Sequence, residues 1–395
     1  MVKLEKLEPL TPEFLESIGF YWHTDSDKSP YIADEAVMVT EEEAEAYYEA
    51  VNTLYEMYVE AGDYVVQNDL FHEIGIPFNL VDAVKKSWEN DVHWHIYGRF
   101  DLAGGIDGKP IKLIEFNADT PTALFETAIV QWALLKANGM DEAGQFNNLY
   151  EAIRDNFKRL IMLEGDIGEF ERYYRGWKIL FSSVRGHIED ENTTKFLRKI
   201  ADDAGFHTAF AHVDEVEFSD EEGIFYDGVQ YEYWFKLIPW EVIAIEESDL
   251  ARILTKIMDN QKAIILNPAY TLMFQSKAMM KILWDLFPNH PLLLDTSFEP
   301  LSIKQVQKPF FGREGGGVKI LDENANVIES AEEIYTEQPS IFQEYIELPR
   351  DADGRSYQAG VFFAYEGCGL GYRRGGEILD NMSKFVSHFI VGERS

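Results

Sequence analysis

Apolar residues recur along the chain with two different periods, and each period predicts one kind of element. From Thr40 to Val66, apolar side chains stand at near-helical spacing among acidic ones. Glu43 follows Thr40 at the distance of a capping box, so we predict that a helix begins there. Other segments share this helical period, and a glycine or a proline closes two of them. These predicted helices are Leu124–Asn138, Thr193–Ala204 before Gly205, and Gln275–Phe287 before Pro288.

Strict alternation of apolar and polar residues marks the predicted strands. Ile96–Ala103 and Pro110–Asn117 alternate on either side of a glycine-rich turn at 104–108, which predicts a β-hairpin. Because helices and strands occur together, the predicted fold class is mixed α/β. Strands and glycines dominate 302–391, and we expect this region to form a two-layer unit of its own. The predicted strands outside the hairpin are Gly176–Val184, Tyr231–Leu237, Ile303–Lys308, Val318–Leu321, Ser340–Ile346, Ser356–Phe363 and Met382–Ile390.

Composition and charge narrow the classes of partner. The 395 residues, of which 46% are hydrophobic, are sufficient for two or three packed domains. Seventy acidic residues stand against 35 basic ones, and the net charge of −35 disfavours nucleic acid or an anionic membrane as the main partner. A cationic substrate suits this charge, although most of the carboxylates are expected to form a solvated surface.

The sequence also bears on the compartment. The single cysteine, Cys368, cannot form an intramolecular disulfide, which fits a reducing environment. No segment reaches the ~20 consecutive apolar residues of a membrane helix, and Met1–Leu15 lacks the apolar core of a signal peptide. We therefore expect a cytoplasmic protein.

The predicted hairpin carries the first group of candidate site residues. Arg99 and Asp101 share one face of their strand, as do Glu115 and Asn117 of the next strand. If Asp101 or Arg99 lies opposite Glu115, all four converge, whereas a shift of one residue would separate them. Two carboxylates and an amide oxygen suit Mg²⁺, with Arg99 beside it to bind a phosphoryl group. Taken alone, the spacing favours a simpler alternative, a surface hairpin with cross-strand ion pairs.

A glycine-rich segment between two predicted strands forms the second group. In Lys308–Gly317, glycine occupies four of the last six positions, namely Gly312, Gly315, Gly316 and Gly317. Successive backbone N–H groups of such a loop can turn towards an anion. The segment is not a Walker loop, because neither the Gly-Lys-Ser/Thr motif nor a helix follows it. The alternative is a flexible hairpin tip.

Three other features carry weaker signals. Lys277 lies near the start of a predicted helix, where a lysine is usually solvated. Gln343–Ile346 ends an apolar strand, and its backbone could bind the edge of an adenine. His93 and His95 share a strand face, but without further nearby ligands we interpret them as structural histidines. Cys368 has no nucleophile signature either.

In order and combination, these segments resemble the glutathionylspermidine synthase family, over nearly the whole chain. The similarity is greatest to bacterial members that resemble only the synthetase half. The segments that carry it are Gly98–Asp101, Glu115–Thr122, Gln275–Ala278, Leu283–His290, Lys308–Gly317 and Asn381–Phe385.

The resemblance implies an ATP-grasp fold in permuted order, preceded by a substrate-binding, pre-ATP-grasp region. It also implies a ligase that uses ATP and Mg²⁺ to join a small carboxylate, such as a peptide or amino acid, to a cationic amine. The predicted regions are 1–130 with the metal-binding hairpin, 131–260 for substrate binding, and 261–395 as the nucleotide clamp with its glycine-rich lid.

The resemblance also implies roles for single residues. Asp101, Glu115 and Asn117 would hold magnesium, and Arg99 would stabilise the transferring phosphoryl group. Residues implied for the nucleotide are Lys277, Lys308, the lid glycines Gly312, Gly315, Gly316 and Gly317, the adenine hinge Gln343, Glu344, Tyr345 and Ile346, and Arg373. Residues implied for the substrates are Thr120 and Thr122 for the acid, and Asp190 and Glu191 for the amine.

The chain departs from the family pattern near its end. Asp380 stands where a basic residue is expected before Asn381, and the role of an upstream arginine falls to Arg373 or Arg374. Glutathione as the acid is therefore left open. A catalytically inactive sensor of nucleotide or polyamine is the alternative function. The acidic stretch 189–191 has an alternative as well, the charged N-terminus of a helix.

Overall fold

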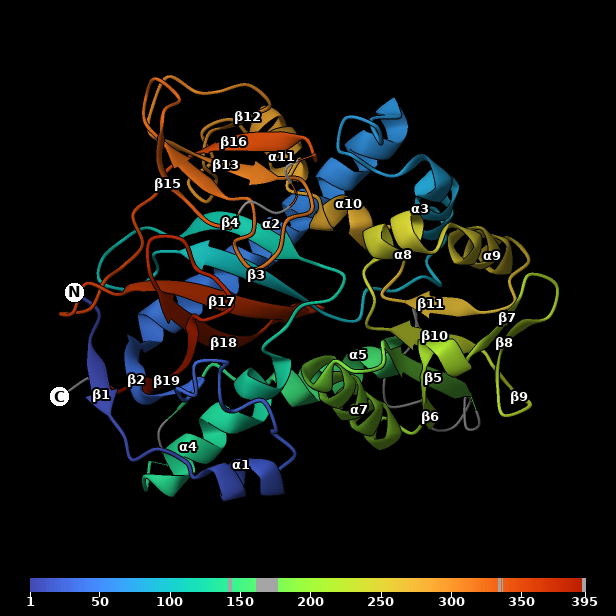
Figure 1. The fold of residues 1–395 in the computed structure, drawn as a ribbon, viewed down its shortest axis with the longest axis horizontal. Helices are drawn as coiled ribbons and strands as arrows, with labels where there is room; N and C mark the ends of the chain where they lie inside the picture. The colour runs from blue at the N-terminus through green and yellow to red at the C-terminus, as the bar shows by residue number, and fades with distance from the viewer. Residues whose placement is uncertain (141–143, 161–176, 333–334, 336, 393–395) are drawn as a thin grey trace.

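The computed structural model describes residues 1–140, 144–160, 177–332, 335 and 337–392. Its centre is a seven-stranded sheet to which both ends of the chain contribute (Figure 1). The strands are antiparallel except for one parallel pair, β2 with β19. In spatial order they are β1 (Leu4–Lys6), β2 (Ile32–Thr40), β19 (Lys384–Val391), β18 (Glu366–Gly375), β17 (Ser356–Ala364), β3 (Gly98–Ala103) and β4 (Lys112–Asn117).

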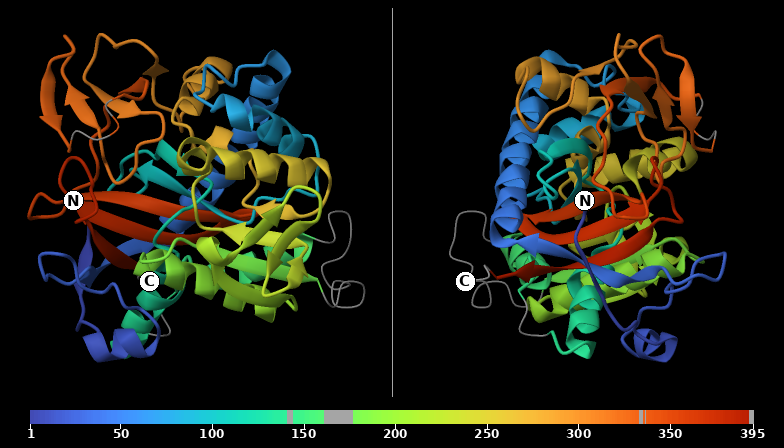
Figure 2. Two further views of the ribbon diagram at one scale, coloured as in Figure 1. Left: turned by 45° about the vertical axis from the view of Figure 1, so that its right-hand side comes forward. Right: turned by 90° about the vertical axis from the view of Figure 1, so that its left-hand side faces the viewer.

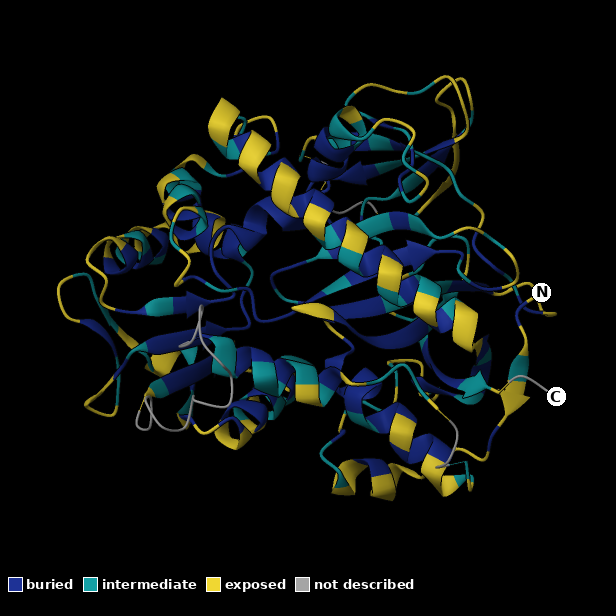
Figure 3. Ribbon diagram, turned by 180° about the vertical axis from the view of Figure 1, so that it is seen from behind, coloured by how far each residue is buried: buried dark blue, intermediate teal, exposed yellow. Residues whose placement is uncertain are grey.

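The long helix α2 (Glu41–Asn68) covers one face of this sheet. It begins as the sequence predicts, because Thr40 Oγ1 accepts from the N–H of Glu43 and the Glu43 carboxylate accepts from the N–H of Thr40. Figure 3 shows its exposed outer stripe and its buried inner stripe. On the inner side, Leu54 and Tyr58 pack in one core with Phe100 of the hairpin. The other face is covered by α1 (Pro12–Ser17) and α4 (Gln131–Ala137) with the π-helical turn Glu126–Val130 before it.

A second, wholly parallel sheet has helices on both faces, as Figure 2 shows from the side. In β5, Leu180 packs into the core beneath α8 and α9, whereas Ile179 and Phe181 pack into the core beneath α5 and α7. The sequence predicts β5 from Gly176, which lies outside the described residues. The strands are β11 (Ile264–Leu266), β10 (Tyr233–Lys236), β5 (Lys178–Ser183) and β6 (His207–His212), and the helices are α5 (Leu149–Arg159), α7 (Ile188–Asp203), α8 (Trp240–Glu246) and α9 (Ser248–Asp259).

Two smaller antiparallel sheets complete the described chain. The five-stranded one lies above the β3–β4 end of the central sheet in Figure 1. Its strands are β12 (Thr296–Ser297), β16 (Ser340–Glu344), β13 (Gln305–Pro309), β14 (Lys319–Leu321) and β15 (Val327–Ser330). The three-stranded one consists of β7 (Glu217–Ser219), β8 (Gly223–Tyr226) and β9 (Val229–Tyr231), and the remaining helices are α3 (Val81–Trp88), α10 (Thr271–Gln275) and α11 (Met279–Leu286).

The sheet pairing corrects the prediction that 302–391 forms a unit of its own. Only β13 to β16 stay within the five-stranded sheet, whereas β17, β18 and β19 belong to the central sheet beside β2 and β3. Hydrophobic alternation identifies a strand but not its neighbours, and β17 pairs with a strand far away in sequence. The limits of the three predicted regions, 1–130, 131–260 and 261–395, stay predictions.

The predicted helix Gln275–Phe287 is corrected at its start, because Gln275 ends one helix and the next helix begins only at Met279. Helix α10 ends at Gln275, Ser276 is extended, and α11 begins at Met279. The break is held from outside the helices. Ser276 Oγ donates to the carbonyl of Ile74 at 2.7 Å, and the N–H of Lys277 donates to the carbonyl of Phe310 at 2.9 Å. Long-range hydrogen bonds therefore override the local helical period.

No helix in the described part of the chain has both the length and the apolar character that crossing a membrane requires.

Candidate functional site

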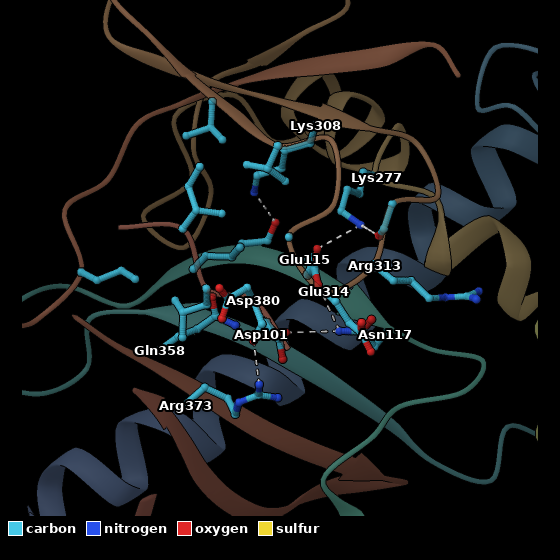
Figure 4. Close-up of a pocket in the computed structure, with 18 of the residues that line it drawn as sticks. Asp101, Glu115, Asn117, Lys277, Lys308, Arg313, Glu314, Gln358, Arg373 and Asp380 are labelled. Carbon is cyan, nitrogen blue, oxygen red and sulfur yellow. Dashed lines mark hydrogen bonds and ion pairs between the residues drawn. The ribbon is translucent and has the colours of Figure 1, made fainter. Parts of the chain in front are cut away.

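A cavity of about 300 Å³ lies between the five-stranded sheet and the β3–β4 end of the central sheet (Figure 4). The predicted residues that line it are Arg99, Asp101, Glu115, Asn117, Thr120, Thr122, Lys277, Lys308, Gly312, Gly315, Gln343, Glu344, Tyr345, Ile346 and Arg373. The predicted residues outside its lining are Gly316, Gly317, Asp190 and Glu191. The structure thus brings together most of a set that is widely dispersed in sequence.

The hairpin register brings its four polar side chains together. Asp101 lies opposite Glu115 and Arg99 opposite Asn117, which is one of the two registers that make the side chains converge. Arg99 binds Asp101 with two hydrogen bonds, of 2.7 Å from Nε and 3.0 Å from Nη2. The Asn117 amide nitrogen lies 3.3 Å from an oxygen of each carboxylate. The converging arrangement is confirmed, and the surface-hairpin alternative is wrong.

The neighbouring strand leaves room for Arg99. Gly360 of β17 pairs with Asp101, and a Cβ at position 360 would lie 3.1 Å from Arg99 Cδ. On the other side, Arg99 Nη1 donates to the carbonyl of Thr122 at 2.7 Å. The guanidinium is therefore fixed by the Asp101 carboxylate and the Thr122 carbonyl, and Gly360 leaves space for the side chain.

Two lysines from other elements reach strand β4 of the hairpin. Lys277, projecting from the break between α10 and α11, lies 3.0 Å from Glu115 Oε2 and donates to the Gly312 carbonyl at 2.6 Å. Lys308 of β13 donates to Gln343 Oε1 at 2.7 Å and to the Ile114 carbonyl at 3.1 Å. Both side chains are buried, so their charge acts in a medium of low dielectric constant.

Burial and mutual attraction shift the pKa values of this group. Burial raises the pKa of Asp101, although Arg99 opposes the shift. Burial acts in the same sense on Glu115, but Lys277 and Lys308 outweigh it and lower its pKa to about 2. Burial lowers the pKa of Lys308 to about 8 in spite of the attraction of Glu115. The cluster is thus a compact arrangement of opposite charges with little water to screen them.

The donor set fits a hard divalent cation such as Mg²⁺. Asp101 and Glu115 each have an oxygen within 3.3 Å of the same Asn117 amide, so their carboxylates point to one place. The raised pKa of Asp101 indicates that its negative charge is incompletely compensated by the protein. A metal held by oxygen atoms of Asp101, Glu115 and Asn117 would supply that compensation.

The glycine-rich loop connects β13 and β14 as the sequence predicts, and it folds over the cavity. Gly315 has φ +71°, and a Cβ there would lie 2.4 Å from the Leu379 carbonyl oxygen. The tip therefore lies against 378–379 in a conformation that a larger residue would strain. Gly316 and Gly317 belong to the loop without lining the cavity.

The end of the cavity near Gln343–Ile346 is largely apolar. Ile114, Val306 and Ile320 contribute to its walls. The hinge backbone is partly engaged, since the N–H of Tyr345 donates to the Lys304 carbonyl at 3.0 Å. Lys304 also lies over the Tyr345 ring, with its Nζ 3.5 Å from the centroid. A flat, apolar ligand portion suits this end.

The departure at Asp380 has a local structural role. Its carboxylate Oδ1 accepts from the N–H of Met382 at 3.0 Å and from the Ser383 hydroxyl at 3.1 Å, which closes a turn. Arg373 donates to the carbonyls of Asp380 and Ser383 at 2.9 and 3.1 Å and so fixes the same turn beside the cavity. Arg374, the other arginine considered from sequence, pairs with Glu35 instead.

The cavity end beyond Thr122 is acidic and aromatic. Tyr31 and Glu189 line it, and burial, followed by repulsion from Glu126, raises the pKa of Glu189 to about 8. Helix α7 begins at Ile188, so the acidic stretch is indeed a helix N-terminus. Glu191 points elsewhere, because it is paired with Lys195 and His212. Of the stretch 189–191, only Glu189 lines the cavity.

Sequence reasoning missed several lining residues. Gln358 is a polar residue near the start of the mostly apolar strand β17, and this contrast could have identified it. Gln275 Oε1 accepts from the N–H groups of Ala118 and Asp119 at 2.9 and 3.2 Å and fixes the chain after Asn117. Glu314 lies within the predicted glycine-rich loop but was given no role, whereas Tyr31 and Glu377 carry no local signal. Their place depends on chain segments that meet only in the fold.

The histidines and the cysteine are parts of the packing. His95 Nε2 lies 2.8 Å from the Ala118 carbonyl, and its ring stacks on Tyr55 with centroids 5.8 Å apart. His93 is buried, and burial lowers its pKa to about 4. Cys368 of β18 is buried as well, and burial raises the pKa of its thiol. The interpretation of His95 as structural is confirmed.

A model of the family described as glutathionylspermidine synthase preATP-grasp matches residues 2–391. The chain belongs to this family. The resemblance carried by the motifs around Arg99, Lys277 and Lys308 is thereby confirmed.

Curated relatives in this family are described as ligases and synthetases. A Haemophilus influenzae protein named "Putative acid--amine ligase" is 29% identical, over 97% of this chain and 98% of its own length. The bifunctional glutathionylspermidine synthetase/amidase of Escherichia coli is 25% identical over 95% of this chain. The chain spans 61% of the length of that bifunctional protein.

A solved structure shares the fold. The glutathione synthetase-like effector of Globodera pallida, determined in the apo form, aligns with a TM-score of 0.56 over 97% of this chain and 98% of its own. The sequences are 11% identical, so this likeness concerns the fold alone.

Proposed function

We propose that the protein is an ATP-dependent ligase of the permuted ATP-grasp type that forms an amide from a carboxylate and an amine. One observation carries the proposal, in a chain of the glutathionylspermidine synthase family. Asp101, Glu115 and Asn117 converge beside Arg99 in a cavity that two buried lysines and a glycine-rich loop complete. Phosphoryl transfer requires ligands for a divalent cation and positive charges for the phosphates. Here carboxylate and amide oxygens would bind the cation, and the lysines would bind the phosphates.

The reaction proceeds through an acyl phosphate. A carboxylate oxygen of the acid attacks the γ-phosphorus of ATP, the bond to the β,γ-bridging oxygen breaks, and ADP leaves. The lone pair of a neutral amine then attacks the acyl carbon, and inorganic phosphate leaves as the amine loses a proton. ATP makes the uphill condensation favourable and provides the leaving group. No protein nucleophile takes part, which agrees with the burial of Cys368.

The chain's own residues align the reactants and balance charge. Lys277 and Lys308 would bind phosphate oxygens, and Gln343–Ile346 would border the adenine. Arg99, fixed by Asp101 and Thr122, would meet the negative charge that grows on the transferring phosphoryl group. Mg²⁺ held by Asp101, Glu115 and Asn117 would neutralise phosphate oxygens. Alignment of this kind can lower a barrier by roughly 7 to 11 kcal/mol in favourable model reactions.

The acidic end of the cavity suits the amine. Glu189 lines the cavity beyond Thr122, and Glu126 lies near it, with Trp22 Nε1 donating to Glu126 Oε1 at 2.9 Å. Two carboxyl groups whose pKa values are raised by burial gain from a bound cation. We therefore assign Glu189, in place of Asp190 and Glu191, to the cationic amine, with Thr120 and Thr122 nearer to the acid.

A pairwise screen tests this function. Amino acids and short peptides are combined with di- and polyamines in the presence of Mg-ATP, and the product mass and ADP release are measured. At least one pair is expected to give an amide whose mass equals that of both substrates less water, with one ADP per amide. Asp101→Ala is the blank. Tight ATP binding without turnover on any pair would contradict the ligase and favour a sensor.

The pH dependence of ATP binding gives a second test, because burial lowers the pKa of Lys308 to about 8. As pH rises through this value the free protein loses the Lys308 charge, so the KM for ATP is expected to rise by up to about tenfold per pH unit. Lys308→Arg, which stays charged, should have a flat KM over the same range. A flat wild-type profile would show that Lys308 does not bind the phosphates.

The lowered pKa of Lys308 also makes the stability of the protein depend on pH, and here a rise in pH is favourable. Between about 8 and the ordinary pKa of 10.5, the unfolded chain holds a proton on Lys308 that the folded chain has lost. The Lys308 contribution to the free energy of unfolding therefore rises with pH across this window.

A further inference from the structure

The glycine-rich loop, residues 312–317, forms an ion pair with a helix distant in sequence through its own side chain Arg313. Figure 4 shows this side chain leading away from the carboxylates of Asp101 and Glu115. It forms an ion pair with Glu241, the second residue of helix α8. The loop therefore has a charged attachment outside the phosphate-binding cluster.

Glu241 is an unusual partner for a loop residue because it is almost fully buried. Its side chain is 6% exposed, against 31% for Arg313. Its Oε2 atom has no hydrogen-bond partner among the residues that the structure describes. Burial raises the pKa of Glu241, and Arg313 is the largest influence that opposes this shift. A buried carboxylate of this kind depends chiefly on its paired cation, here Arg313, for compensation.

Helix α8 is itself tied to the metal-binding hairpin. The Asp119 carboxylate, two residues after Asn117, accepts from the N–H of Trp240 at 2.9 Å. Asp119 also pairs with Lys236, whose Nζ lies 2.9 and 3.1 Å from its two oxygens, and both side chains are fully buried. A rigid connection therefore runs from the strand that carries Asn117, through Asp119, to the first turn of α8 and to Glu241.

We propose that Glu241 is a positioning residue that holds the glycine-rich loop closed over the cavity through Arg313. The ion pair ties the glycine-rich loop to α8, the helix that is also bound to the chain after the hairpin. Glu241 touches no reactant in this role and acts through the loop. The part of the inference that concerns ATP retention rests on the proposed function, whereas loop closure itself does not.

Limited proteolysis tests loop closure without any substrate. Trypsin is added to the wild type and to Glu241→Gln, and the cut after Arg313 is followed by mass spectrometry. Because proteolysis reports the population of open loop, the variant is expected to be cut at least about tenfold faster. Glu246→Gln is the control, since Glu246 is an exposed carboxylate at the end of the same helix. It should be cut at the wild-type rate.

The loop side of the pair provides a second variant, should Glu241→Gln fail to fold. In Arg313→Gln the cut after Glu314 by a glutamate-specific protease should be accelerated to a similar extent. The double variant should be cut no faster than either single one, because both remove the same interaction. Equal cutting of wild type and single variants would overturn the proposal.

Steady-state kinetics separate the two proposals. If the ligase function is right, Glu241→Gln should raise the KM for ATP about tenfold while kcat changes less than about twofold, because loop closure retains the nucleotide. Faster cutting without ligation of any acid–amine pair would leave the loop attachment standing and refute the function. Ligation of an acid–amine pair together with an unchanged rate of cutting would support the ligase function and refute the loop attachment.

Discussion

Arg99→Ala is expected to lower kcat by about 10³-fold or more while the KM for ATP changes only a few-fold, because arginines that meet transition-state charge contribute 10³ to 10⁵ in related phosphoryl transfers. Arg99 donates two hydrogen bonds to the Asp101 carboxylate and one to the Thr122 carbonyl. In the proposed reaction, this orientation would direct its charge towards the transferring γ-phosphoryl group. Kinetics with the acid–amine pair found by the screen measure the effect.

Two companion variants make the Arg99 result interpretable. Arg99→Lys keeps the charge but loses the two-pronged contact with Asp101, so an intermediate kcat is expected. Arg355→Ala removes an exposed arginine for which the described residues provide no ion pair, and it should leave kcat unchanged. A weakened ATP affinity with kcat intact in Arg99→Ala would show that this arginine binds the nucleotide and does not assist the chemistry.

Lys236→Met is expected to lower the free energy of unfolding by about 3 to 5 kcal/mol, the cost of leaving a buried charge without its partner. Lys236 and Asp119 are both fully buried, and Lys236 also donates to the Ile238 carbonyl at 2.8 Å. The variant leaves the Asp119 carboxylate with only the N–H of Trp240. Urea denaturation monitored by tryptophan fluorescence measures the loss.

The matched control for Lys236→Met is Lys262→Met, at an exposed lysine, which should change the free energy of unfolding by less than about 0.5 kcal/mol. Replacing Asp119 by leucine in addition to Lys236→Met should recover much of the loss, because the unpaired charge is then gone. A loss below about 1 kcal/mol in Lys236→Met alone would show that the Lys236–Asp119 pair contributes little to stability.

The elements that sequence patterns predict well are those whose cause is local. The helix from Thr40 begins where its capping box requires, and the hairpin forms between Ala103 and Lys112 as its turn residues indicate. Residue types at Arg99, Asp101, Glu115 and Asn117 indicate chemistry, but the register that makes them converge comes from the folded sheet. Alternation alone therefore left two arrangements open, converging or separated side chains, and the folded sheet has the converging one.

The features that sequence patterns missed depend on contacts distant in sequence. The break before Lys277 is made by Ile74 and Phe310, and the helical period around it gives no sign of it. The ion pair of Arg313 with Glu241 joins a loop to a helix that was not predicted. Similarly, the acidic stretch 189–191 was identified, but only the folded helix shows which of its side chains faces the cavity.

The place of β17 in the central sheet constrains the order in which the chain can mature during synthesis. Asp101 has Glu115 as a neighbour early, but its other flank is Gly360, which leaves the ribosome much later. A growing chain that ends before β17 has unpaired β3 edge groups and a charged cluster open to water. Such sequence-distant pairing slows folding and exposes strands to aggregation in the meantime. The candidate site is thus completed almost last, although Asp101 and Glu115 are synthesised early.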